Sequence, residues 1–311
     1  MTDPTDLRIL CPGGNFTNVG GLIAHGLARG EGLPRGSTIA AVTGTPYAEL
    51  ALRGPDLVLE GRYQLAITTP SWHLTEADRG RGRLRTLATF PHDDQLVLAV
   101  RAEHGVTSLH DVRERELPLR ISMPTKESGH PAAFALERLF SLYGFTVADL
   151  ERWGGTVLHD RPRYPNQPES VPVDPSFDAV FDEAVMTWRW KRISEGYDLT
   201  YLPIEPDVLA RCAELGMPSG ALRAGRLRGV ERDVPTIDFS GWVLYCADDL
   251  PDEVVRCTMA AIDEQREQIS ARFTGPTAAM TAPVDMRRLH LDPPVPLHPA
   301  AEHYYKDKGY L

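Results

Sequence analysis

Short apolar runs alternate with stretches of helical periodicity along most of the chain. Leu7 to Cys11 is the first apolar run, and Val19, Leu22, Ile23 and Leu27 then recur at the spacing of one helix face. The same alternation continues to the C-terminal third. The pattern predicts strands at 37–42, 63–68, 95–100, 119–123 and 242–246, and helices at 131–143, 206–215 and 252–273. An alternation of this kind predicts an α/β protein.

The first strand leads into a glycine-rich turn that carries Gly13 and Gly14. The helix after it is expected to start near Asn15 or Thr17, and either side chain could cap it. Backbone N–H groups at such a helix start can bind a carboxylate or a phosphate. The alternative is a tight turn that binds nothing. The turn matches neither a dinucleotide fingerprint nor a phosphate-binding loop.

Length and charge narrow the class of protein. A chain of 311 residues is long for one core, so two lobes are expected. The composition, 42% hydrophobic and 24% charged, is that of a globular protein, and no run of 18 apolar residues occurs. The formal net charge of −10 argues against nucleic acid as a partner.

Five segments, taken in order, resemble one known family. They are TIAAVTGTPYAELALRGPDLVLEGRYQLAITTPSWHLTEADRGRG, SMPTKESGHPAAFALERLFSLYGF, FDAVFDEAV, DVPTIDFSGWVLYCADDLPDEVV and LHPAAEHYYKDKGYL. Together with the N-terminal turn they resemble the TAXI family of solute-binding proteins of TRAP transporters. The resemblance implies an α/β periplasmic-binding-protein-like fold of type II, with a ligand cleft between two lobes. Lobe I is expected to comprise residues 1–98 and 236–311, and lobe II residues 99–235.

The resemblance implies an exported protein, but the N-terminus predicts another location. Residues 1–6 lead directly into the first strand, without a basic segment, an apolar segment or a cleavage site. The four cysteines, Cys11, Cys212, Cys246 and Cys257, have no disulfide-framework spacing. We therefore expect a cytoplasmic protein, or a periplasmic one if the sequence has been trimmed. Transporter subunits would be partners only in the second case, and homo-oligomerisation is left open.

Candidate ligand-binding residues of lobe I follow its strands, because ligands of open α/β sheets lie beyond the carboxyl ends of the strands. They are Gly13, Gly14, Asn15, Phe16, Thr43, Thr45, Thr69, Ser71 and Trp72. His73 and His92 are candidates for moving protons. The alternatives are that Trp72 only packs, that His73 is a surface residue, and that residues 92–94 form a turn. No metal and no cofactor are expected.

Lobe II offers a second helix start. Thr125, Lys126, Ser128 and His130 precede a helix that begins at Pro131. By the same physics as the first turn, this is expected to be a second anion site.

Asp182 and Glu183 depart from the resembled family, which has small polar residues after this strand. Burial of Glu183 against the following tryptophans would raise the pKa of its carboxyl, as general-acid chemistry requires. The alternative is that Asp182 caps the next helix and Glu183 lies in its first turn.

Two functions follow from these features. The first is a TAXI-type binding protein that traps a small carboxylated solute. The second is a cytoplasmic enzyme on the same fold, a cofactor-independent decarboxylase, dehydratase or related lyase. Its substrate would be a small carboxylated compound, aromatic ones included, with His73, His92 and Glu183 as catalytic residues.

Overall fold

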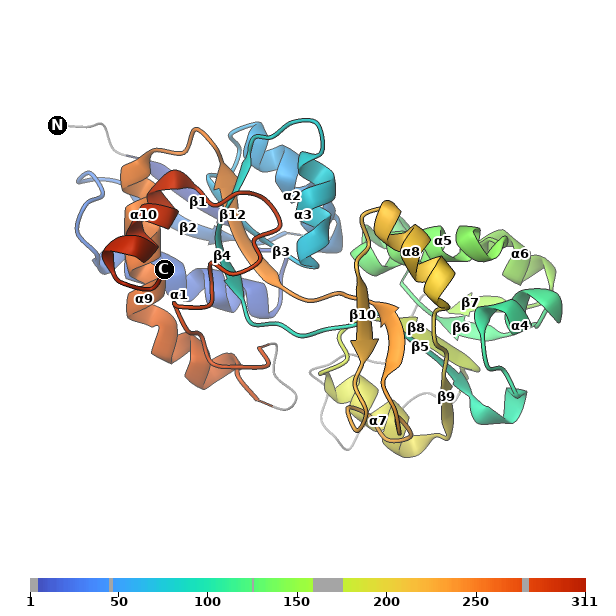
Figure 1. Cartoon of the computed structure of the whole chain (residues 1–311). Helices are drawn as coiled ribbons and strands as arrows, with labels where there is room; N and C mark the ends of the chain where they lie inside the picture. Colours follow the sequence, from blue (N-terminus) through green and yellow to red (C-terminus); the bar gives the residue numbers. More distant parts are fainter. Residues whose placement is uncertain (1–4, 45–46, 125, 159–175, 276–279) are drawn as a thin grey trace. The chain divides into compact units, whose positions relative to one another are not determined.

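The computed structural model describes residues 5–44, 47–124, 126–158, 176–275 and 280–311. The chain divides into two compact units, each with its own sheet (Figure 1). Unit 1 comprises residues 1–93 and 240–311, and unit 2 comprises residues 94–239. Unit 1 is therefore built from both ends of the chain, and unit 2 from one continuous segment.

Unit 1 contains a five-stranded sheet in the order β2-β1-β3-β12-β4. Its strands are β1 (Asp6–Leu10), β2 (Thr38–Val42), β3 (Leu65–Thr68), β4 (Leu84–Phe90) and β12 (Trp242–Ala247). β1 pairs in parallel with β2 and β3, whereas β12 runs antiparallel to both β3 and β4. Every residue of β3 and β12 is buried, as expected for central strands covered on both faces.

The helices of unit 1 are α1 (Asn15–Arg29), α2 (Tyr47–Leu59), α3 (Ser71–Asp78), α9 (Asp252–Phe273) and α10 (Pro299–Asp307). The backbones of α1 and α9 approach closely. A Cβ atom built on Gly26 of α1 would lie only 2.9 Å from the Cβ of Ala261 in α9. A residue without a side chain is therefore required at this crossing.

Unit 2 contains a sheet in the order β7-β6-β8-β5-β9 and a two-stranded β10-β11 pair. The strands are β5 (Val97–Arg101), β6 (Arg120–Ser122), β7 (Thr156–Leu158), β8 (Ala179–Asp182), β9 (Leu199–Tyr201), β10 (Ser219–Leu222) and β11 (Val234–Ile237). β6 runs parallel to β7 and β8, and β5 runs antiparallel to β8 and β9.

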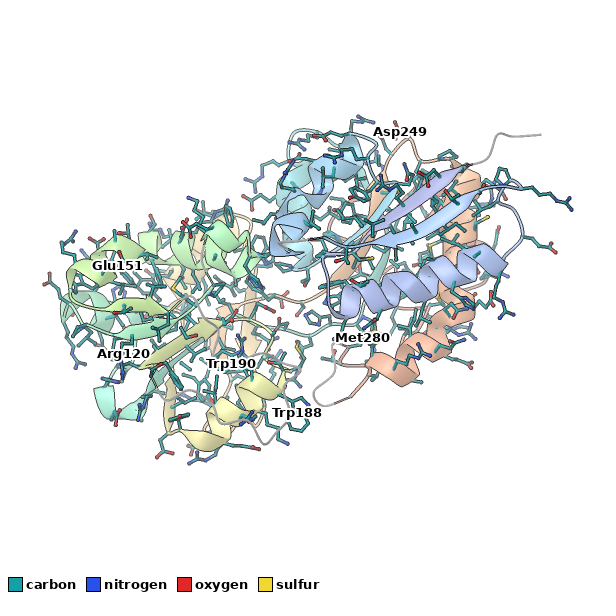
Figure 2. All side chains as sticks on the ribbon, turned by 180° about the vertical axis from the view of Figure 1, so that it is seen from behind. Arg120, Glu151, Trp188, Trp190, Asp249 and Met280 are labelled. Carbon is teal, nitrogen blue, oxygen red and sulfur yellow. The ribbon has the colours of Figure 1, made fainter. Side chains whose placement is uncertain are left out.

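Short helices surround this second sheet. They are η1 (Ala102–His104), α4 (Leu109–Glu114), η2 (Lys126–Ser128), α5 (Pro131–Tyr143), α6 (Val147–Arg152), α7 (Trp188–Gly196) and α8 (Pro206–Glu214). Trp190 of α7, labelled with Trp188 in Figure 2, is fully buried in the core of unit 2. Among the helices of the described residues, none is both long and apolar enough to cross a membrane.

The two segments that join the units are hydrogen-bonded to each other. In unit 2, the Phe239 N–H donates to the Asp94 carbonyl at 2.8 Å, and the Leu96 N–H donates to the Ile237 carbonyl at 3.0 Å. In unit 1, the Gly241 N–H donates to the His92 carbonyl at 2.8 Å. The crossover segments are thus a paired ribbon and not two independent linkers.

Candidate ligand-binding sites

One edge of the unit 1 sheet collects the residues predicted for lobe I. Because β1, β2 and β3 are parallel and β12 is antiparallel to both β3 and β4, four strands end at the same edge. Gly13 to Phe16 follow β1, Thr43 follows β2, Thr69 to His73 follow β3, and His92 follows β4. Thr45 lies outside the described residues.

The glycine turn leaves open space at the start of α1. Gly14 is the N-cap residue, with a φ of 54° that favours glycine, so the prediction that Asn15 or Thr17 caps the helix is wrong. A Cβ atom built on Gly14 would meet nothing within 4 Å. No side chain of the described residues caps α1, and its first turn contains no acidic residue. The positive end of the helix dipole is therefore not neutralised by a described side chain.

The indole ring of Trp242 lies beside this helix start. The ring of Phe16, in the first turn of α1, stacks on Trp242 at the start of β12 with 4.0 Å between ring centroids. The ring of His92 lies 5.3 Å from the same indole. Trp242 is only 3% exposed, and its Nε1 is buried without a hydrogen-bond partner among the described residues. A buried donor in this state costs about 1–3 kcal/mol unless a ligand or water accepts from it.

Two threonine hydroxyls at the same edge of the sheet also lack a hydrogen-bond partner in the described part of the chain. Oγ1 of Thr69 and Oγ1 of Thr89 are buried without a partner among the described residues. A Cβ atom built on Gly241 would lie 2.9 Å from Ser71 Cβ and 3.4 Å from Thr89 Cγ2, so these chain segments are in tight contact. This edge of unit 1 thus has several polar groups that its own described residues do not satisfy.

The remaining candidates of unit 1 have structural contacts. Trp72 is 6% exposed. Nε2 of His73 lies 3.2 Å from the Leu52 carbonyl and connects α3 to α2. The catalytic roles assigned to His73 and His92 stay predictions.

In unit 2, the helix start expected to bind an anion is already capped. Nδ1 of His130 accepts a hydrogen bond from the Ala132 N–H at 3.2 Å, Pro131 has no N–H, and the Ala133 N–H donates to the His130 carbonyl. Nζ of Lys126 lies 3.4 Å from a carboxylate oxygen of Glu137. The N–H groups of Ala132 and Ala133 are therefore already hydrogen-bonded, which argues against the helix N–H groups as the anion-binding donors. Thr125 lies outside the described residues, and Ser128 ends η2.

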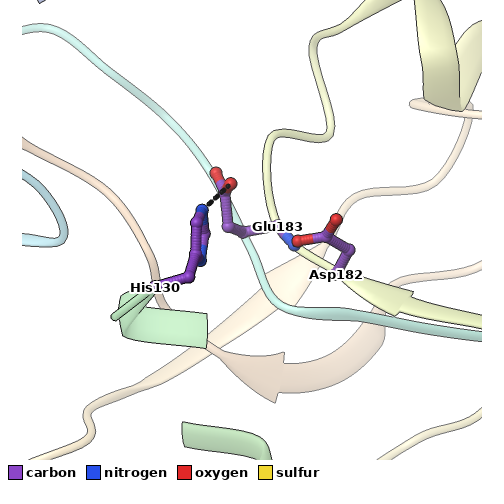
Figure 3. Close-up of side chains that lie close together, drawn as sticks. All are labelled: His130, Asp182 and Glu183. Atoms are coloured by element: carbon purple, nitrogen blue, oxygen red, sulfur yellow. Dashed lines mark hydrogen bonds and ion pairs between the residues drawn. The ribbon is translucent and has the colours of Figure 1, made fainter. Parts of the chain in front are cut away.

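His130 is instead oriented towards Glu183 (Figure 3). Its Nε2 lies 3.3 Å from Oε1 of Glu183, and the two side chains are 11% and 12% exposed. Because Nδ1 accepts from a backbone N–H, the neutral ring carries its proton on Nε2 and donates it to the carboxylate. The two predicted site residues that lie 53 positions apart in sequence thus form one pair.

Glu183 is held on both sides by its neighbours. Its carbonyl accepts hydrogen bonds from Arg189 Nη2 and Trp190 Nε1, each at 2.9 Å. After it, the Ala184 and Val185 N–H groups donate to the carboxylate of Asp94, also at 2.9 Å. This network fixes the backbone that presents the Glu183 side chain.

Asp182 has a structural role that the sequence did not predict. It forms a buried ion pair with Arg189, and its Oδ1 accepts from the Glu183 N–H at 2.9 Å. It does not cap the next helix, because the N-cap residue of α7 is Thr187.

His130, Asp182 and Glu183 offer ligand atoms within 4.8 Å of one another, which raises the question of a metal ion. Nε2 could bind a metal only if the ring proton moved to Nδ1, where it would oppose the Ala132 N–H. Both carboxylate oxygens of Asp182 are already engaged, by Arg189 and by the Glu183 N–H. The described geometry therefore does not fit a metal site.

Comparisons with known proteins identify the fold of the chain. No protein-family model matches the chain, and a search of curated proteins found no match. Solved structures match over nearly its full length. XAC2383 from Xanthomonas citri, bound to chloride ion, is 11% identical with a TM-score of 0.50, and the match covers 99% of each chain. The chain has the periplasmic-binding-protein fold.

Two further solved structures are more distant. MatC from Rhodopseudomonas palustris, with bound malate, is 14% identical with a TM-score of 0.46, and the match covers 97% of each chain. The CA3427 gene product of Candida albicans, described as exhibiting the generic periplasmic binding protein structural fold, is 12% identical with a TM-score of 0.38. That match covers 98% of this chain and 81% of that one. The predicted periplasmic-binding-protein fold is confirmed, and the narrower TAXI assignment stays a prediction.

Sequence reasoning missed several residues of these sites. Trp242 was assigned only to a strand, although its place after Gly241 at a strand start was a usable signal. Thr89 and Arg189 gave no signal, because their roles depend on strand pairing and on the turn before α7.

Proposed function

We propose that this protein binds a small carboxylated solute at the carboxyl edge of the unit 1 sheet. The observation that carries the proposal is the buried indole N–H of Trp242, without a described partner, stacked against the first turn of the uncapped helix α1. Donors and a positive helix end in one place favour a carboxylate over a cation. The solved structures support the fold and contribute nothing to the choice of ligand.

In this proposal the ligand carboxylate accepts hydrogen bonds from the α1 N-terminus and from Trp242 Nε1. The hydroxyls of Thr69 and Thr89 bind its polar substituents, and the Phe16 ring contacts its apolar part. Membership of the TAXI family, with transporter subunits as partners, is the narrower proposal and rests on the order of the five sequence segments.

A panel of aliphatic and aromatic mono- and dicarboxylates tests the proposal by thermal shift and calorimetry. A ligand that binds only the native state raises the melting temperature. Trp242→Phe keeps the ring but removes the donor, so we expect it to weaken binding by about tenfold or more. Trp153→Phe in unit 2 is the matched control. Wild-type affinity in Trp242→Phe, or no binding by any member of the panel, would contradict the proposal.

A second function, a lyase acting on a small carboxylated substrate, is favoured by one observation. Glu183 and His130 form a largely buried carboxylate–imidazole pair, an arrangement suited to moving a proton. Mass spectrometry of the same mixtures distinguishes the two functions, because a binding protein returns its ligand unchanged. If a carboxylate is consumed, Glu183→Gln should reduce turnover by at least about 100-fold. Unchanged turnover in that variant would exclude Glu183 as the catalytic group.

A further inference from the structure

Ala184, the residue after Glu183, has a backbone conformation that alanine rarely adopts. Its φ is 63°, in the left-handed region, and an alanine side chain has no polar group that could compensate locally. Such a conformation costs about 1 kcal/mol or more and persists only where the surroundings impose it. The turn at 183–185 therefore needs an external support.

Asp94 provides that support. Its side chain is fully buried and accepts from the Ala184 N–H through Oδ2 and from the Val185 N–H through Oδ1. Two charge-assisted hydrogen bonds to consecutive N–H groups set the direction of the chain just after Glu183. Asp94 does not touch the Glu183 side chain in these bonds, so it acts through the backbone.

Asp94 also belongs to the crossover ribbon. Its carbonyl accepts from the Phe239 N–H at 2.8 Å, and the next residue, Gln95, forms a bridge with Asp238. One residue thus contacts the second crossover segment through its backbone and the Glu183 turn through its side chain.

We infer that Asp94 is a positioning residue, which holds the strained turn at Ala184 so that Glu183 points at His130, and which links this pair to the crossover ribbon. The inference deepens the second proposed function, the lyase, because the pair that Asp94 positions is the one proposed to move a proton in that reaction. The orientation itself does not depend on any ligand, so it can be tested separately.

The test is a rescue experiment read by ¹⁵N NMR of the histidine rings at constant pH, without ligand. In Asp94→Asn an amide NH₂ replaces one acceptor oxygen and faces a backbone N–H, so the turn loses a hydrogen bond. We expect the His130 Nε2 signal to move to its position in Glu183→Ala, in which the ring N–H has lost its acceptor. Glycine adopts a positive φ without strain, so adding Ala184→Gly should restore the wild-type signal.

Asp149→Asn is the matched control, because Asp149 also accepts from a backbone N–H, that of Thr146, at the start of α6. It should leave the His130 signal unchanged. A wild-type signal in Asp94→Asn, or no rescue by Ala184→Gly, overturns the inference. If Asp94→Asn alone does not fold, the double variant decides. Recovery of both fold and signal supports the inference, and failure of either overturns it.

The carboxylate panel then separates this inference from the proposed function. If NMR shows the rescue but the wild type consumes no carboxylate, the positioning role stands and the lyase function fails. If the wild type consumes a carboxylate but the NMR signal is insensitive to Asp94, the lyase function stands and the positioning role fails.

Discussion

At the scale of single residues, carboxylates that accept several hydrogen bonds recur as anchors in unit 2. Asp178 is the clearest case. It accepts from the backbone N–H of Arg120 at 2.8 Å and from two nitrogens of the same guanidinium, with His104 3.3 Å away. These bonds, led by those from the Arg120 side chain, lower the pKa of the Asp178 carboxyl from 3.8 to about 2.

This shift predicts a dependence of stability on pH. Because the folded pKa lies below the unfolded one, the stabilisation is present above pH 3.8 and is lost as the pH falls towards 2. We expect the wild type to lose about 2 kcal/mol of unfolding free energy through this group in that window. Asp178→Asn should lack this part of the loss in urea unfolding at a series of pH values.

The exposed Asp233, which pairs with Arg223, provides the comparison. The pKa of its carboxyl is also lowered, first by the bond from the Ala224 N–H, but solvent screens the group. Asp233→Asn should change the acid dependence less than Asp178→Asn does. If the wild type and Asp178→Asn lose the same unfolding free energy between pH 3.8 and 2, the Asp178–Arg120 ion pair does not cause the pH dependence.

At the scale of elements, α1 and α9 cross in close backbone contact. Gly26 and Gly21 lie on different faces of the same helix. A Cβ on Gly26 would meet Ala261, including its carbonyl oxygen at 3.2 Å, whereas a Cβ on the exposed Gly21 would meet nothing within 4 Å.

The two glycines give a matched pair of substitutions. Gly26→Ala should destabilise the protein by about 1–3 kcal/mol, because α9 must move to admit a methyl group. Gly21→Ala should stabilise it by about 0.5–1 kcal/mol, because alanine is the better helix former. Urea unfolding of both variants measures the difference. Equal effects of the two changes would mean that the crossing tolerates an extra methyl group.

The elements also show what the sequence could predict. The helix at 252–273 was predicted with its observed bounds, since its apolar residues recur over 22 positions. Ser108, the N-cap residue of α4, and Gly144, the C-cap residue of α5, are of types that favour these positions, because cap chemistry is local. The β10 strand was missed, because a pairing such as that of Ser219 with Ile237 has no local signature.

The same distinction applies to the candidate sites: features set by neighbouring residues could be predicted, and contacts between residues distant in sequence could not. The glycine turn and its place before α1 were predictable from neighbouring residues. The partnership of His130 with Glu183 was not, because it depends on β6 and β8 being adjacent and parallel. The anion site at α5 stays a prediction, and its mechanism is weakened because the His130 ring itself caps the helix, which could not be foreseen from the neighbouring residues.

At the scale of the whole molecule, the two units differ in how the chain builds them. Unit 2 is continuous, and its sheet is complete by residue 201. The sheet of unit 1 is interrupted after β4 and receives its last strand 150 or so residues later, from residues 242–247. The two proposed roles therefore depend on segments that are completed at different points along the sequence. Proton transfer at Glu183 needs only unit 2, whereas solute binding at the unit 1 edge also needs β12.

The position of β12 has a consequence for biosynthesis. This strand is inserted between β3 and β4 and is buried along its whole length, yet it is translated after all of unit 2. A ribosome therefore releases β3 and β4 with their inner edges unpaired for the time needed to make roughly 150 more residues, about 8–30 s at about 5–20 residues per second. Open strand edges of this kind are where nascent chains aggregate. Unit 2 can fold during that interval, whereas the sheet of unit 1 cannot be completed until its central strand emerges.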